Sequence, residues 1–147
     1  MRKALVLTLA ISMAVTIIAV AGCGGDDTTT VTIPGGEATL SGKPPGEAEL
    51  GVPIYADAQY VPESGSTMTG TTEEGEFITA SASFKTDDDF EDVVDWYIER
   101  LGEPSYLSRE EPKEANWMHI AESGEVIVVN IDDDGDEVVI SIGRMSD

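Results

Sequence analysis

The chain has 147 residues, of which 29 are acidic and 8 are basic, so its net charge is −21 at pH 7. This charge argues against nucleic acid, which needs a basic binding surface, and against direct adsorption to anionic lipid head groups. Because the chain has one cysteine, it cannot form an internal disulfide, and its folded part must be held by a hydrophobic core.

Residues 1–22 have the order of a bacterial secretion signal. Arg2 and Lys3 form a positive start, and an apolar run from 4 to 20 follows them. The apolar residues from 4 to 21 are also long enough to cross a bilayer, so a transmembrane anchor is the alternative. Removal of residues 1–22 takes away two basic residues and no acidic one, which would leave the mature chain at about −23.

Val20, Ala21, Gly22 and Cys23 end the apolar run, and these four residues resemble the lipobox of bacterial lipoproteins. In that family the cysteine is acylated and becomes the mature N-terminus. The resemblance implies lipidation at Cys23, and acyl chains contribute about 0.8 kcal/mol per buried methylene to membrane binding. We therefore expect a lipid-anchored, extracytoplasmic protein on the bacterial cell membrane or on an outer membrane. An unmodified thiol is the remaining alternative.

Residues 23–49 are expected to be the lipidated N-terminus and a flexible linker. They are rich in Gly, Thr and Pro and have few large apolar residues, so they lack the burial that would offset the entropy of ordering. The alternation from Thr29 to Ile33 leaves an isolated strand as an alternative. Residues 50–147 are about the size of a common single domain.

Two strands and a helix are predicted in the first half of this domain. Residues 76–84 alternate, and Glu74-Gly75 predicts a turn back to a polar strand over 66–72, expected at a sheet edge. A helix is predicted from a cap at Thr86 to a stop at Gly102. Its apolar stripe consists of Phe90, Val93, Val94, Tyr97, Ile98 and Leu101.

Three further strands are predicted after the helix. A two-residue turn at Asp134-Gly135 pairs Ile131 with Val138, Val129 with Ile140, and Ile127 with Ile142. A second turn at Ser123-Gly124 sets Ile120 beside Ile127 and Met118 beside Val129. In this register Ile120 and Met118 belong to the buried aliphatic face.

The predicted fold is therefore α+β, with an antiparallel sheet of about five strands and one helix on one face, in the order strands, helix, three-strand meander. A second resemblance concerns the domain opening, Gly51-Val52-Pro53-Ile54-Tyr55-Ala56-Asp57-Ala58, together with the Val93-Val94-Asp95-Trp96-Tyr97 helix. The two segments are similar to a group of small uncharacterised bacterial lipoprotein domains. That resemblance implies no catalytic residues.

The opposite sheet face is a candidate binding face. The predicted register places Trp117, His119, Val126, Val128 and Val139 on it, and these residues are too apolar for a surface in plain contact with water. Either the segment 52–61 and the loop after the helix cover this face, or a protein partner or apolar ligand docks on it.

The run from Asn130 to Gly135 has the oxygen spacing that begins an EF-hand calcium loop. Asn130, Asp132, Asp134 and Asp136 are weak metal candidates, because Ser141 stands where the bidentate Glu is required. A solvated hairpin turn explains the same residues. No cofactor is expected beyond weak Ca²⁺.

The sequence therefore predicts a non-enzymatic envelope module that binds a protein partner or small ligand. We expect the module to be attached to the membrane through lipid on Cys23, and we expect no binding to nucleic acid. The alternatives are an acidic calcium-binding protein and an envelope hydrolase, for which His119, the one histidine of the chain, would need a nucleophile and a carboxylate beside it.

Overall fold

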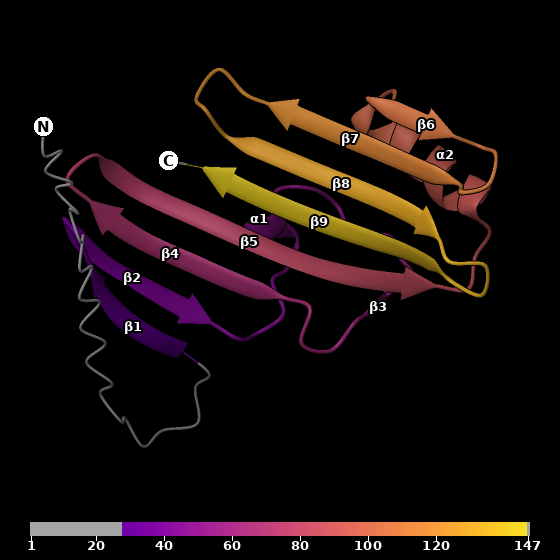
Figure 1. Ribbon diagram of the computed structural model, residues 1–147. Helices are drawn as coiled ribbons and strands as arrows, with labels where there is room; N and C mark the ends of the chain where they lie inside the picture. Colours follow the sequence, from indigo (N-terminus) through magenta and orange to yellow (C-terminus); the bar gives the residue numbers. More distant parts are fainter. Residues whose placement is uncertain (1–27, 147) are drawn as a thin grey trace, which may run out of the picture.

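Residues 28–146 are described by the computed structural model, and most of them lie in strands of one antiparallel sheet (Figure 1). The elements in chain order are β1 (Thr28–Ile33), β2 (Gly36–Ser41), α1 (Glu47–Leu50), β3 (Gln59–Tyr60), β4 (Ser66–Thr72), β5 (Gly75–Thr86), α2 (Phe90–Leu101), β6 (Tyr106–Ser108), β7 (Glu114–Ile120), β8 (Val126–Asp133) and β9 (Val138–Ser146). The spatial order of the sheet is β1-β2-β4-β5-β9-β8-β7-β6, and β3 pairs with the end of β5.

The core lies on one face of the sheet, under α1 and α2. Alternate residues of the central strands are buried there, among them Ala82 and Phe84 of β5, Ile131 of β8 and Ile140 of β9. Leu50 of α1 is fully buried and belongs to the same core cluster. In Figure 1 both helices lie behind the sheet, so the face toward the viewer is the one that no helix covers. We call it the uncovered face.

Helix α2 forms where the apolar stripe predicts a helix, and Phe90, Val93, Val94 and Tyr97 are buried. Its N-cap is Asp89 and not Thr86, because β5 continues through Thr86. Trp96 lies at the edge of the core. Its ring makes edge-to-face contacts with Tyr55 and Tyr97, at 5.3 and 4.8 Å between centroids, and the Arg100 guanidinium lies 3.8 Å from its centroid.

The α+β prediction of about five strands and one helix is wrong. The described part of the chain is mostly β, with nine strands in one sheet and two short helices. Four of the nine strands were not expected, namely β1, β2, β3 and β6. The hairpin β1-β2 falls in the expected linker, and β2 pairs with β4 from Glu37↔Thr71 to Ser41↔Thr67. Strand β4, expected at an edge, is therefore inside the sheet.

Glycine makes the contact between β2 and β4 feasible. A Cβ atom on Gly36 would lie 1.7 Å from the backbone oxygen of Thr71, which no side chain tolerates. The alternation from Thr29 to Ile33 indicates a strand, which is β1, but it does not indicate β2 or the pairing of the hairpin with β4, some 30 residues further along the chain.

Both predicted hairpin registers are also wrong, with different consequences. Asp134 N–H donates to Glu137 O at 3.0 Å, so the turn is centred on Gly135 and Asp136, and Ile131 pairs with Ile140 rather than Val138. This shift of two residues keeps every side chain on its expected face. Gly135 has φ of +87°, the positive value that the first central position of such a hairpin turn requires.

The hairpin between β7 and β8 differs by one residue. Ala121 N–H donates to Glu125 O at 2.8 Å, and the three-residue loop between them ends at Gly124, with φ of +89°. Trp117 therefore pairs with Val129, and Met118 pairs with Val128. Because side chains alternate along a strand, a shift of one residue moves the side chains of β7 to the opposite face.

Candidate functional site

The uncovered face carries a contiguous group of apolar side chains, which we call the apolar patch. Ile120, Val126 and Met145 are direct cross-strand partners on β7, β8 and β9, and Met118 pairs with Val128 in the next row. The first row continues through Thr79 to the partners Met68 and Leu40. The patch consists of Leu40, Met68, Met118, Ile120, Val126, Val128 and Met145.

Four of these side chains are exposed, and Met68, Val126 and Val128 are half-buried. Ile120 is 64% exposed, and Met118 and Met145 are each 54% exposed. Contiguous apolar surface of this kind marks interaction sites on soluble proteins, whereas single exposed apolar residues are ordinary. The patch runs across neighbouring strands, so it is contiguous.

Methionine is concentrated on this face. Met68, Met118 and Met145 are the methionines of residues 28–146, and all three belong to the apolar patch rather than to the core. The unbranched, polarizable thioether side chain adapts to differently shaped partners, and methionine is common on binding surfaces for that reason.

Two carboxylates lie on the uncovered face beyond the patch, and the Asn116–Asn130 pair separates them from Met118 and Val128. Glu114 of β7 and Asp132 of β8 are direct cross-strand partners on the uncovered face, and like charges in this arrangement repel. Lys85 is on the same face, but its Nζ lies 2.7 Å from Glu137 Oε1, and this hydrogen bond raises the pKa of Lys85. The lysine charge is therefore already paired with a carboxylate.

Three of the five residues predicted for the binding face lie on the uncovered face. Val126, Val128 and Val139 are half-buried there. Met118, Ile120 and Met145 are the residues that sequence reasoning missed. The signal for Met118 and Ile120 was the loop length between β7 and β8, which decides the face of every β7 side chain.

Trp117 does not belong to the binding face, because it is buried on the helix side of the sheet, at 5% exposure. Its ring lies 5.8 Å from that of Tyr97, and its Nε1–H donates to Gly102 O at 2.8 Å. The loop that follows α2 therefore accepts the hydrogen bond of the indole N–H, and the indole ring is buried in the core. Burial also raises the pKa of Tyr97, whose hydroxyl donates to Pro53 O at 3.2 Å.

His119 is exposed near the end of β7 and is the cross-strand partner of Ile127, on the face opposite the apolar patch. It lines neither of the two surface hollows described below. The grouping of His119 with a nucleophile and a carboxylate that the hydrolase alternative requires is not found at these hollows.

The calcium candidates lie on a β-hairpin and not on an EF-hand loop. Asn130 Oδ1 accepts a hydrogen bond from Asn116 Nδ2 on the neighbouring strand, and Asp134 and Asp136 are exposed at the turn. Within residues 28–146 no group of three or more His, Cys, Asp or Glu side chains is placed to hold a metal ion. Weak calcium binding stays an untested prediction.

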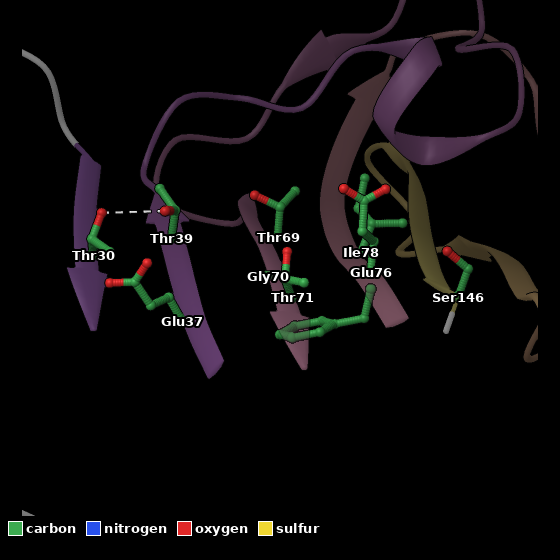
Figure 2. Close-up of a pocket in the computed structure, with 10 residues that line it drawn as sticks. Thr30, Glu37, Thr39, Thr69, Gly70, Thr71, Glu76, Ile78 and Ser146 are labelled. Carbon is green, nitrogen blue, oxygen red and sulfur yellow. Dashed lines mark hydrogen bonds between the residues drawn. The ribbon is translucent and has the colours of Figure 1, made fainter. Parts of the chain in front are cut away.

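The larger hollow, of about 640 Å³, lies near the β1 edge of the sheet (Figure 2). Hydroxyl and carboxyl side chains of neighbouring strands line it, and Thr30 Oγ1 lies 3.2 Å from Thr39 Oγ1. Glu37 and Glu76 flank Thr71 from two different strands. These two carboxylates belong to no group of three or more His, Cys, Asp or Glu side chains that could hold a metal ion among residues 28–146. The smaller hollow, of about 260 Å³, includes the Lys85–Glu137 pair.

Val20, Ala21, Gly22 and Cys23 lie outside the described residues, so the lipobox stays a sequence-based expectation. Among residues 28–146, neither helix is long and apolar enough to cross a membrane. Comparison of the chain with protein-family models, curated proteins and solved structures finds no match.

Proposed function

We propose that this chain is a lipid-anchored, non-enzymatic module of the bacterial cell envelope, which binds a basic protein partner through the apolar patch. The observation that carries the proposal is the exposure of the patch, on a sheet face that no helix covers. The lipid anchor is supported by the resemblance of residues 20–23 to a lipobox.

Charge complementarity supports a basic partner. The chain has 29 acidic and 8 basic residues, and Glu114 and Asp132 repel one another on the same face, beyond the Asn116–Asn130 pair that follows the patch. An arginine or lysine of the partner seated between these two carboxylates would relieve that repulsion. Complementary charge also speeds association and disfavours partners of like charge.

The first experiment tests the anchor. The full-length chain and its Cys23→Ser variant are expressed in bacteria, and their intact mass and membrane partitioning are compared. We expect the parent chain in the membrane fraction with the mass of an acylated protein that begins at Cys23. If the Cys23→Ser chain partitions and is processed like the parent, the lipid anchor is refuted.

The second experiment tests the docking face in cells, with a photo-reactive amino acid in place of Ile120 or of the exposed Glu103 as control. We expect a discrete cross-linked protein from position 120 and not from position 103, and its loss when Met118 and Met145 are both changed to Glu. The cross-linked protein is then purified. Its binding should weaken with added salt and with Glu114→Gln. Equal cross-linking at both positions, or binding insensitive to these changes, would contradict the proposal.

A further inference from the structure

The two edges of the sheet differ in a way that bears on self-association. Edge strand β6 has three residues, and Arg109, Glu110, Glu111 and Pro112 follow it. Charged residues, proline and short length are the features that protect an edge from pairing with another chain. Edge strand β1 is twice as long and has neither charge nor proline within its six residues, although Asp26 and Asp27 precede it in the sequence and Pro34 follows it.

Strand β1 also has the composition and the free backbone that pairing requires. Its residues are Thr28, Thr29, Thr30, Val31, Thr32 and Ile33, all with β-branched side chains that favour strands. Within the described residues β1 pairs with β2 alone, so alternate backbone N–H and C=O groups along its outer edge have no strand partner.

We infer that two copies of the chain pair through the outer edges of β1, antiparallel, about a two-fold axis perpendicular to the sheet. An antiparallel strand can always pair with its own copy about such an axis, which makes the contact self-complementary. The longest pairings are centred on Thr30 or on Val31.

Both sheet faces continue across this contact with like side chains. The axis returns each side chain to the same face, so the threonines at 28, 30 and 32 meet the same threonines of the second copy. On the uncovered face, Val31 meets Thr29 in the pairing centred on Thr30. In the pairing centred on Val31, Val31 meets Val31 and Ile33 meets Thr29 of the second copy. Thr–Thr and β-branched cross-strand pairs are stabilising, whereas charged edges of two such acidic chains would repel.

The proposed function would strengthen this pairing, and this step rests on the anchor at Cys23. Only four residues, 24–27, separate Cys23 from Thr28, so an extended chain holds β1 within about 18 Å of the acyl group. Confinement near one membrane surface raises the effective concentration of the edges relative to one another.

The test is disulfide cross-linking of the full-length chain in bacterial membranes. Thr30→Cys and Val31→Cys variants are compared with Thr69→Cys, whose residue is exposed on β4 inside the sheet, and with the parent chain, which reports any dimer formed through Cys23. Directly opposite residues in a sheet have Cα atoms about 4.5–5.5 Å apart, within the range of a disulfide.

We expect a reducible dimer from Thr30→Cys or Val31→Cys, several-fold above Thr69→Cys and the parent. Absence of this dimer, or equal dimer from Thr69→Cys, would overturn the inference. Fractionation of the same cells reports the anchor separately. If the chain is in the membrane fraction but forms no dimer, the pairing alone is refuted. If the chain is absent from the membrane fraction, the proposed anchor is refuted.

A charge exchange provides the second measurement, because it does not depend on thiol chemistry. Thr30→Lys and Thr30→Glu should each reduce co-purification of two differently tagged copies. Like charges then lie directly opposite in the pairing centred on Thr30, and diagonally across the contact in the pairing centred on Val31. Mixing the Lys and Glu chains should restore it. The same two substitutions at Thr69 should leave co-purification unchanged. Failure of the mixture to recover association would contradict pairing through β1.

Discussion

At the scale of single residues, Asp133 shows how the hairpin between β8 and β9 is held. Its Oδ1 accepts the Gly135 N–H at 2.9 Å, and its Oδ2 lies 3.2 Å from Lys113 Nζ. The Gly135 hydrogen bond and the lysine together lower the pKa of Asp133 below its usual value. The folded state therefore favours the ionised carboxylate, and the turn is tied to the segment that leads into β7.

This lowered pKa makes one contribution to stability depend on pH. The contribution is fully present above the pKa of an unfolded Asp, about 3.9, and is lost as the pH falls through the lower folded-state pKa. Asp133→Asn should therefore lower the Tm at pH 7, while near pH 2 its Tm should equal that of the parent. Thermal unfolding followed by circular dichroism measures this, with Asp134→Asn as control. An equal deficit at both pH values would contradict the assignment.

At the scale of elements, strand β7 separates the core from the uncovered face. Trp117 is 5% exposed and its neighbour Met118 is 54% exposed, although both are large and apolar. The difference follows from the three-residue loop between β7 and β8, which sets the pairing of Trp117 with Val129. One loop residue therefore decides which of the two side chains is buried in the core and which is exposed on the uncovered face.

Two substitutions on β7 measure this division directly. Trp117→Ala should lower the free energy of unfolding by about 3–5 kcal/mol, because it leaves a large cavity and an unsatisfied Gly102 carbonyl. Met118→Ala should change it by less than about 0.5 kcal/mol, as expected for an exposed residue. Urea denaturation of both variants gives the values. Similar losses from the two would show that the faces are assigned wrongly.

At the scale of the whole molecule, the net charge opposes folding. Side chains of like sign are crowded over the surface of a chain with 29 acidic and 8 basic residues, and their repulsion disfavours the compact state. The ion pairs of the described part, such as Arg144 Nε with Glu125 Oε1 at 2.6 Å, engage only a small part of this negative charge. The proposed lipid anchor would therefore have to act against electrostatic repulsion from an anionic membrane.

Salt should consequently stabilise this protein at neutral pH. Raising NaCl from about 0.1 M to about 1 M shortens the Debye length from about 10 Å to about 3 Å, so the Tm at pH 7 should rise. The sequence pI is about 4.1, so the same salt titration near pH 4 should have little effect. Calorimetry at the two pH values distinguishes screening from general salt exclusion. A rise of equal size at both would contradict the role given to net charge.

Local patterns in the sequence were sufficient for the elements that carry their own signal. The spacing of Phe90, Val93, Val94 and Tyr97 predicts α2, and Asp134-Gly135 places a turn close to the observed one, because helical periodicity and positive φ at glycine are properties of neighbouring residues. The sequence also assigns Val126, Val128 and Val139 to the correct face. The predicted register of β8 and β9 is wrong by two residues, and a shift of two residues leaves every side chain on the same face.

Tertiary structure alone decided the rest. The hairpin β1-β2 becomes part of the sheet through contacts with β4, and β5 pairs with β9 more than fifty residues away, as at Ala80↔Arg144. Such pairings depend on which strand edges meet in three dimensions, and composition does not encode that choice locally. The exposure of Met118 and Ile120 was decided in the same way, since one added loop residue exchanges the two faces of β7.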